Sequence, residues 1–451
     1  MTQTPETRAA GRRSAAAQLA NAYGMLAVLA LLCAFFALAT YHDENPTGAA
    51  AGTALAAGLK GRTGVIIVQS QDSEGETFAR SLEEALSKAG TPARGTLSGD
   101  PPTVRAALER LAASEPLGVV ATTRACADWT LFEALKAEGG AYAGLEVIAP
   151  RPVRGSTFLS ASNLRNIADQ ISVIAIMAVG MTLVIITGGI DLSVGSLLAF
   201  GSVTAAWMIA HMGGVAAGPG ALILASVATI LLCGLVGSVN GAMVTLFKVP
   251  PFISSLAMMQ VTSGLAFIVS GGLSIFDIPK SFVWLGRGAD LGGIPNAVAL
   301  MALIYVAAHI VMSQTRIGRN IYALGGNFEA ARLSGISTRK VLMLVYSISG
   351  IMAGVGGVIT TSQLRAGSAT YGAMYELYVI AAVVVGGASL SGGEGRIFGT
   401  LIGALIIGVI RNGMNLMDVE PYLQKVVLGL VILGAVLLDM LKRKRWSKAG
   451  A

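Results

Sequence analysis

The sequence predicts an all-α polytopic membrane protein with about ten transmembrane helices and a small inserted α/β domain outside the cytoplasm. Hydrophobic residues make up 54% of the 451 positions, charged residues only 13%, and the mean hydropathy is +0.68. Apolar runs long enough to cross about 30 Å of hydrocarbon recur along most of the chain. One interval, residues 60–154, is instead rich in charged residues and alternates short apolar strands with amphipathic helices.

The chain begins with a polar, alanine-rich segment, residues 1–22, that carries three arginines before the first apolar run, residues 23–41. Cations beside a span favour the cytoplasmic side of a membrane. We therefore expect a cytoplasmic N-terminal tail followed by the first transmembrane helix. A cleaved signal peptide is the alternative, but Tyr41-His42-Asp43 lacks the small residues of a cleavage site.

A linker of small residues, 43–59, leads to the interval 60–154, which we expect to be a water-soluble domain. Its pattern predicts strands at 64–69, 93–97, 118–122 and 145–149 and helices at 76–89, 102–113 and 128–138. That alternation indicates a small parallel sheet covered by helices, on the outer side because one span precedes it. The interval has no histidine, one cysteine and no phosphate loop, so a binding or docking module, or a purely structural insertion, is expected.

The main membrane region, residues 158–441, opens with a short amphipathic lead-in, Phe158–Ile167. Nine apolar runs follow, at 168–187, 193–212, 221–246, 252–270, 297–314, 341–362, 376–392, 396–416 and 421–441. Ten crossings in total return the chain to the cytoplasm, and the C-terminal tail, residues 442–451, is accordingly basic.

A polar segment, residues 316–340, separates two of these runs and carries five cations against one acid, which places it in the cytoplasm. Gly325, Gly326 and Asn327 are expected to break the chain. Asn327 can cap a helix that follows, and Gly335 can end this helix after about two turns. On physical grounds alone, the segment is either a short helix with its own role or a loop that only sets topology.

The stretch Thr187–Ser196 interrupts the apolar region with two glycines and places Asp191 and Ser193 before the next run. Asp191 is a good N-cap, because its carboxylate would accept from the free amides of the first helical turn. Ionisable residues at membrane depth also mark pathways or switches. Asp191 and Ser193 are therefore candidates for lining a path across the membrane, with capping as the simpler interpretation.

Other polar residues in or near the predicted spans are Asn240, Gln260, Gln363 and Asn412. They could hydrogen-bond the hydroxyl groups of a sugar along a path, or they could join helices, which is the commoner role. Three glycine pairs at four-residue spacing should let helices approach closely: Gly237 with Gly241, Gly350 with Gly354, and Gly399 with Gly403.

Several functional classes are disfavoured by what the sequence lacks. No segment matches the G-x-x-x-x-G-K-[ST] phosphate loop, so any ATP hydrolysis must come from another subunit. The spans lack the chains of Asp, Glu and His that a proton relay needs. The net charge of +7 comes from cations beside span ends and does not indicate nucleic-acid binding. The scattered histidines and cysteines predict no metal site, and we expect no cofactor and no catalytic set.

Four stretches taken together resemble the permeases of bacterial ABC importers for ribose and similar monosaccharides: Gly180–Ser196, Asn240–Met258, Gly318–Ile336 and Val383–Leu416. The likeness covers Phe158–Leu441 nearly without gaps, plus the first span. It implies a half-transporter of the bacterial inner membrane, in which two permease subunits, identical or different, enclose the path. It also implies two cytoplasmic ATPases that drive alternating access and a periplasmic binding protein that delivers the sugar.

The resemblance gives the cytoplasmic segment a coupling role, in which its short helix docks in a cleft of the ATPase. The residues that match this motif are Gly326, Asn327, Glu329, Ala330, Ala331 and Gly335. Docking would also account for the alanines, because small side chains allow a close approach.

The interval 60–154 departs from the family pattern, in which only a short loop follows the first span. It could contact the binding protein, replace part of its function or gate the outer mouth, and docking is the hypothesis that its predicted placement favours. From the residues alone, two other classes stay open: a secondary transporter driven by an ion gradient, and a membrane sensor that uses the α/β domain.

Overall fold

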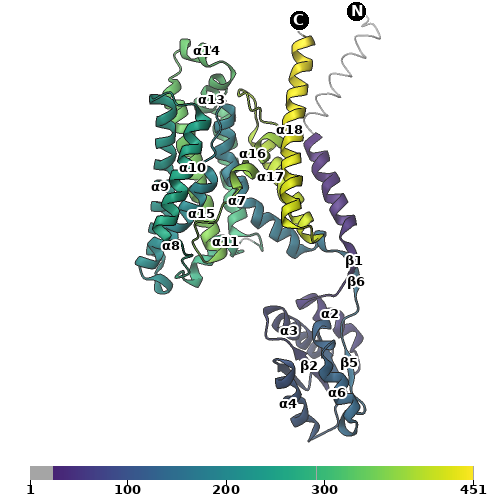
Figure 1. Cartoon of the computed structure of the whole chain (residues 1–451). Coiled ribbons are helices and arrows are strands. Elements are labelled where there is room, and N and C mark those ends of the chain that lie inside the picture. Colours follow the sequence, from purple (N-terminus) through teal and green to yellow (C-terminus); the bar gives the residue numbers. More distant parts are fainter. Residues whose placement is uncertain (1–23, 291, 450–451) are drawn as a thin grey trace, which may run out of the picture. The chain divides into compact units, whose positions relative to one another are not determined.

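The chain folds into two compact units (Figure 1). The structure is a computed structural model that describes residues 24–290 and 292–449, so the predicted tail, residues 1–22, lies outside the described residues. One unit joins Met1–Thr40 to Phe158–Ala451 and is called the helical unit. The other, Tyr41–Thr157, is called the α/β unit and holds all the strands of the described residues.

The helical unit is built from long apolar helices. Among the described residues, seven are long and apolar enough to cross a membrane: α7 (Ala161–Ile186), α8 (Val194–His211), α9 (Pro219–Leu246), α10 (Pro251–Ser270), α12 (Asn296–Gln314), α15 (Thr338–Leu364) and α17 (Ile397–Leu416). Three shorter apolar helices accompany them: Gly24–Ala39, α16 (Tyr375–Val385), and Pro421–Leu437 within α18 (Pro421–Ala449). The structure therefore confirms a mostly helical membrane fold.

Two boundaries differ from the sequence-based expectation. The run 376–392 is helical only as far as Val385, because Gly387 has a positive φ of 86° and the chain leaves the helix there. The expected lead-in, Phe158–Ile167, is mostly the first part of α7. Ser160 caps this helix, its Oγ accepting from the backbone N–H of Asn163 at 3.3 Å.

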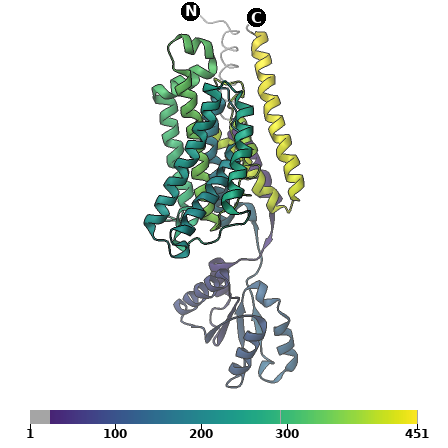
Figure 2. The ribbon, with the colours of Figure 1, turned by 60° about the vertical axis from the view of Figure 1, so that its left-hand side comes forward.

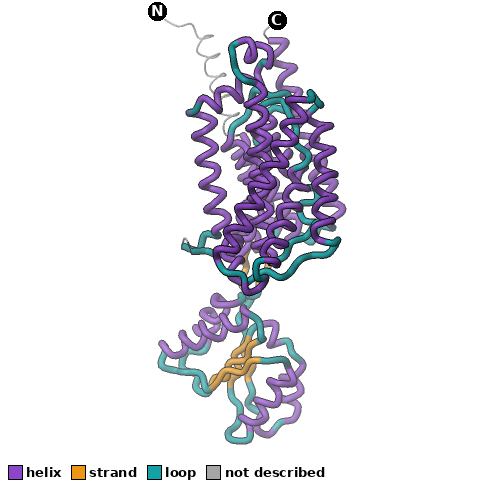
Figure 3. The backbone as a smooth tube through the Cα atoms, turned by 90° about the vertical axis from the view of Figure 1, so that its left-hand side faces the viewer, coloured by secondary structure: helices purple, strands orange, loops and turns teal. Residues whose placement is uncertain are grey.

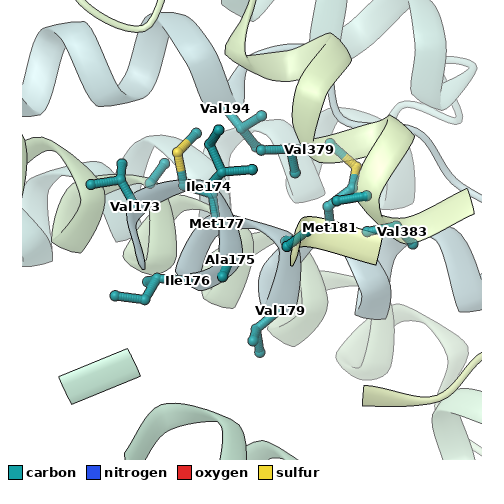
Figure 4. Packing of buried hydrophobic residues seen from close by; sticks show 14 of the residues in the cluster. Val173, Ile174, Ala175, Ile176, Met177, Val179, Met181, Val194, Val379 and Val383 are labelled. Carbon is teal, nitrogen blue, oxygen red and sulfur yellow. The ribbon is translucent and has the colours of Figure 1, made fainter. Parts of the chain in front are cut away.

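Helix α7 lies at the centre of the helical unit, and every side chain from Ile171 to Ile186 is buried. Figure 4 shows its apolar side chains packed together with Val194 of α8 and with Val379 and Val383 of α16. A helix that is apolar on all sides is stable only when other elements surround it. By contrast, α9, α10 and α12 leave most of their apolar surface exposed, as expected of helices that face lipid or another subunit.

The predicted glycine pairs lie at helix contacts. A Cβ atom built on Gly237 of α9 would stand 3.0 Å from the Cα atom of Gly350 in α15. A Cβ atom on Gly354 of α15 would stand 2.9 Å from Cβ of Cys233 in α9. Gly403 of α17 lies in the same way against the backbone of α16. These contacts confirm that small residues allow the helix backbones to approach closely.

The α/β unit contains the predicted parallel sheet. Its strands are β2 (Val65–Gln69), β3 (Gly95–Ser98), β4 (Val119–Thr122) and β5 (Glu146–Ile148), in the spatial order β3-β2-β4-β5. Figure 3 shows helices on both sides of these strands. The helices are α3 (Ser73–Lys88), α4 (Pro101–Ala112), the short α5 (Arg124–Ala127) and α6 (Thr130–Glu138). Alternate residues of β2 enter two cores, Val65 and Ile67 in one and Ile66 and Val68 in the other.

The expected linker, residues 43–59, is instead structured. It contains the end of β1 (Tyr41–Glu44), which pairs antiparallel with β6 (Val153–Ser156), and the whole of α2 (Gly48–Gly58). Helix α2 packs on α3, where a Cβ atom on Gly52 would meet the carbonyl oxygen of Phe78 at 2.6 Å. The small residues that make this segment resemble a linker are the ones that allow the close contact.

Candidate translocation and coupling site

The first part of the site is a turn between α7 and α8. Gly188 has a positive φ of 78°, and the N–H of Gly189 donates to the carbonyl oxygen of Val184 at 3.0 Å. A left-handed glycine of this kind closes a helix and redirects the chain. The turn carries Asp191 into the interior of the helical unit, where its side chain is fully buried.

The Asp191 carboxylate accepts four hydrogen bonds. Oδ1 accepts from the backbone N–H of Ser193 at 3.0 Å, from Ser193 Oγ at 2.6 Å and from Asn240 Nδ2 at 3.4 Å. Oδ2 accepts from Ser349 Oγ at 2.8 Å. The expectation that Asp191 is the N-cap of the next helix is corrected, because Ser193 occupies that position and Asp191 binds the turn before it. A buried carboxylate needs such donors because it has lost its contact with water.

Besides α9 and α15, the hydrogen bonds also reach a third helix, α10. Ser254 Oγ of α10 donates to Asn240 Oδ1 of α9 at 2.6 Å. We call Asp191, Ser193, Asn240, Ser254 and Ser349 the Asp191 cluster; each of them is buried. The cluster joins the α7–α8 turn to α9, α10 and α15 through polar contacts inside an otherwise apolar unit. Any movement of these helices past one another must therefore rearrange it.

The second part of the site is the polar segment between α12 and α15. It forms α13 (Arg316–Gly326) and α14 (Phe328–Leu333). Asn327 caps α14, its Oδ1 accepting from the N–H of Ala330 at 2.9 Å, and Gly335 follows the helix with a positive φ of 82°. The predicted two-turn helix is confirmed. Gly325 and Gly326, however, do not break the chain, because they form the last turn of α13, a helix that the sequence reasoning missed.

Helix α14 lies at one end of the helical unit (Figures 1 and 2), and its surface mixes apolar and charged side chains. Phe328 is 47% and Leu333 81% exposed, and between them Glu329 and Arg332 form an ion pair of 2.6 Å. Ala331 is only 4% exposed and packs inward. The expectation that Ala331 allows a close approach to an ATPase therefore does not fit its position, whereas Ala330 is exposed on the same helix.

Helix α13 connects this surface to the Asp191 cluster. A Cβ atom on Gly325 would clash with the carbonyl oxygen of Ile186 and would lie 2.6 Å from the backbone nitrogen of Gly393. The N–H of Gly393 itself donates to the Ile186 carbonyl oxygen at 2.9 Å, and Tyr322 Oη donates to the Gly395 carbonyl oxygen at 2.8 Å. The end of α13, the loop after α16 and the end of α7 thus meet at one point, just before the turn that holds Asp191.

Comparison with known proteins identifies the family of the helical unit. A family model described as branched-chain amino acid transport system / permease component matches residues 163–436, more than half of the chain. The chain belongs to this permease family. It is thus a multi-pass membrane protein and, as a permease subunit, is not itself catalytic.

Three relatives are similar to the permease over most of their own length. It is 44% identical over 303 residues to the ribose import permease protein of Escherichia coli strain K12, covering 66% of this chain and 92% of the relative. It is 41% identical over 314 residues to the ribose import permease protein of Bacillus subtilis strain 168, covering 69% and 95%. For the D-allose transport system permease protein of Escherichia coli strain K12 the identity is 38% over 288 residues, covering 64% and 86%. No solved structure matches the chain.

The family match contains both parts of the site and leaves out the α/β unit, because it begins at residue 163. The resemblance drawn from four sequence stretches is therefore confirmed for the helical unit. The α/β unit, Tyr41–Thr157, lies outside the residues that the family model matches.

The remaining polar candidates lie apart from the Asp191 cluster. Gln260 of the permease is exposed on α10. Gln363 Nε2 of α15 donates to the carbonyl oxygen of Asp169 in α7 at 3.4 Å. Asn412 of α17 and Asn163 of α7 exchange two amide hydrogen bonds, of 3.0 and 2.8 Å. Gln363 and Asn412 therefore join helices, which is the commoner of the two roles considered for them.

The sequence reasoning missed Ser254 and Ser349, which complete the Asp191 cluster, and Asn163, which pairs with Asn412. Serine is common in membrane helices of this kind, so neither serine is distinguished by its type or spacing. The one local signal was that Ser349 directly precedes Gly350 of a glycine pair, where α15 lies against α9. Among the described residues, no group of three or more His, Cys, Asp or Glu side chains could hold a metal ion.

Proposed function

We propose that this permease is the transmembrane subunit of an ATP-driven importer for a monosaccharide such as ribose. The observation that carries the proposal is the 44% identity to the ribose import permease protein of Escherichia coli strain K12 over 92% of that relative. The family match, residues 163–436, spans the Asp191 cluster, α13 and α14. No comparable observation supports a transporter driven by an ion gradient or a membrane sensor.

The proposed topology has ten crossings of the bacterial inner membrane, with both termini in the cytoplasm. The seven long helices and the three shorter apolar ones support this number. Helix α16 alone is too short to span about 30 Å, so its crossing would be completed by the partly buried loop that follows, since irregular backbone is tolerated inside protein. In Figures 1 and 2, α13, α14 and the C-terminal end of α18 lie at one end of the helical unit, as a shared cytoplasmic face requires.

In this proposal α14 docks in a cleft of the cytoplasmic ATPase. An exposed apolar pair, Phe328 and Leu333, flanks the Glu329–Arg332 ion pair on a helix that is held at both ends, by the Asn327 cap and by Gly335. Four residues of the family motif are exposed at this surface: Gly326, Asn327, Glu329 and Ala330. Ala331 is buried beneath them. A rigid helix with an apolar tip suits a partner that moves it as a lever.

The proposed coupling runs from α14 through α13 to the membrane path. ATP-driven closure of the ATPase subunits would shift α13, and the contact of Gly325 with Ile186 would pass the shift to the α7–α8 turn. Asp191, Ser193 and Asn240 would then exchange hydrogen-bond partners as α9, α10 and α15 move between two packed arrangements. The serine and amide groups around Asp191 suit this role, because hydroxyl and amide donors can replace one another at the carboxylate.

The complete importer would contain a second permease subunit, two ATPases and a periplasmic binding protein. The apolar exposed faces of α9, α10 and α12 support contact with lipid and with the second subunit. Because the α/β unit follows a single crossing in the chain, the same topology puts it in the periplasm, the compartment of the binding protein.

The experiment is uptake of labelled D-ribose into proteoliposomes that contain the permease, its ATPase and its binding protein. We expect uptake to need ATP inside the vesicles and binding protein outside them. Uptake that proceeds without ATP and follows an imposed proton or sodium gradient would contradict the proposal. D-allose, assayed in parallel, tests whether the importer takes another aldose.

A further inference from the structure

The α/β unit has a feature that the permease function does not use, at the carboxyl edge of its parallel sheet. The chain passes from β2 outward to β3 and then crosses to the other side of β2 to form β4 and β5. In open α/β sheets, ligands bind beyond the carboxyl ends of the two strands at which the order reverses. In this unit those strands are β2 and β4.

The pairing of the strands brings the residues of this edge together. Val68 of β2 is the register partner of Thr122 of β4, so the residues that follow both strands leave the sheet side by side. Ser70 and Asp72 follow β2, and Thr122 donates its hydroxyl to the Val68 carbonyl oxygen at 2.8 Å, which holds the two strand ends together. We call Gln69, Ser70 and Asp72 the β2 edge.

Gln69 is the residue that indicates a ligand site. It is only 8% exposed, and its Oε1 atom is buried without a hydrogen-bond partner among the described residues. Buried side-chain acceptors in native proteins are nearly always paired, so an unpaired one needs an explanation. Gln69 follows Val65 and Ile67 on the face of β2 that packs against α3, and as the last residue of the strand it lies where α3 begins. Its side chain thus leaves the strand at the edge of the sheet.

The other groups of the edge indicate the charge of the ligand. Asp72 caps α3, with Oδ1 accepting from the N–H of Gly75 at 2.5 Å and Oδ2 from Ser70 Oγ at 2.8 Å. The carboxylate therefore occupies the position at which a helix N-terminus would otherwise attract phosphate, and it repels anions. An amide oxygen, a carboxylate and a serine hydroxyl together offer mainly acceptors. Acceptors in a site without a net positive charge suit the hydroxyl groups of a neutral polyol.

We propose that the β2 edge is a monosaccharide-binding site, in which Gln69 Oε1 and the Asp72 carboxylate accept hydrogen bonds from sugar hydroxyls. The choice of a sugar among neutral polyols rests on the proposed import function, whereas the site itself rests on the sheet order and on Gln69. The permease would then carry a sugar-binding unit of its own on the outer side, in addition to the path through its helices.

The test uses the full-length chain in lipid nanodiscs, without ATPase or binding protein, and measures equilibrium binding of labelled D-ribose and D-allose. We expect saturable binding of at least one sugar to the native chain. Gln69→Leu and Asp72→Asn should each weaken it at least about tenfold, because a site built to bind hydroxyls loses a partner. Asp72→Asn keeps a capping side chain, so this variant should fold even if Gln69→Leu does not.

Asp100→Asn is the matched control. Asp100 caps α4 as Asp72 caps α3, its Oδ1 accepting from the N–H of Thr103 at 3.1 Å, but it follows β3, away from the reversal of strand order. This variant should bind sugar like the native chain. Hydrogen exchange across β2 and β4 shows whether each variant keeps the native sheet.

Three results would overturn the site: no saturable binding of either sugar, binding of inorganic phosphate that competes with the sugar, or an equal loss in Asp100→Asn. Uptake with ATPase and binding protein is measured separately on the same preparations. Native uptake combined with no direct binding would remove the site and leave the import function standing. Direct binding that depends on Gln69, without ATP-dependent uptake, would support the site and contradict the import function.

Discussion

Gly325 of α13 lies so close to the carbonyl oxygen of Ile186, at the end of α7, that a side chain at this position would clash with it. The two residues lie 139 positions apart in the sequence. Their contact is the point at which the surface segment α13–α14 touches the element that leads into Asp191. Gly325 is therefore required for its small size and not for its backbone conformation. A larger residue would push α13 away from the end of α7.

Replacing Gly325 by alanine should therefore uncouple the permease from its ATPase. The added methyl group must displace α13 or the end of α7, and such overpacking typically costs about 1–3 kcal/mol. We expect sugar uptake to fall at least about tenfold while ATP hydrolysis continues, measured side by side in proteoliposomes. Gly429→Ala is the matched control, because a Cβ atom on Gly429 of α18 has open space. Equal uptake in the two variants would remove Gly325 from the coupling contact.

Leu333, 81% exposed on α14, is expected to be buried by the ATPase. Leu333→Glu should weaken ATPase association at least about tenfold, because a charge would have to lose its water in an apolar cleft. Co-purification of the ATPase from detergent extracts measures this loss. Leu273→Glu is the control, since Leu273 is also highly exposed, at 76%, but follows α10 instead of lying in α14. Normal association of Leu333→Glu would count against docking through α14.

Asp191→Asn should destabilise the helical unit and reduce uptake. An asparagine oxygen can still accept from Ser193, but its amino group cannot accept from Ser349, which leaves a buried donor unpaired. The expected loss of stability is about 1–3 kcal/mol, read from thermal unfolding in detergent. Asp277→Asn, at an exposed position, should unfold like the native chain. If Asp191→Asn unfolded at the native temperature and transported sugar at the native rate, the Asp191 cluster would contribute neither to stability nor to transport.

The stability of the α/β unit should depend on pH through Asp72. The hydrogen bond from the N–H of Gly75, and then that from Ser70, lower the pKa of Asp72 in the folded unit. A lowered pKa contributes stability that is complete above the unfolded value, about 4, and is lost as the pH falls through the folded pKa. The stability difference between the native chain and Asp72→Asn, followed by hydrogen exchange of the unit, should shrink on acidification. A difference that stays constant below pH about 4 would contradict this account.

The family and the helical fold could be predicted from the sequence because their signals are local. The length of an apolar run decides whether it can span a bilayer, and all seven long helices lie on predicted runs. The capping of α14 was predicted correctly, since Asn327 and Gly335 act on neighbouring residues. The same local signals misled where packing decides the outcome, as in α2, whose alanines and glycines have the composition of a linker.

Contacts between distant parts of the chain were decided by the tertiary structure alone. Asp191 and Ser193 were singled out as neighbours in sequence, but their bonds to Asn240 and Ser349 arise only because α9 and α15 pack at paired glycines. The inward position of Ala331 and the unpaired oxygen of Gln69 likewise depend on neighbours remote in the chain. Hydrophobic periodicity fixes which segments become helices or strands, whereas the packing of one element on another determines which polar atoms meet.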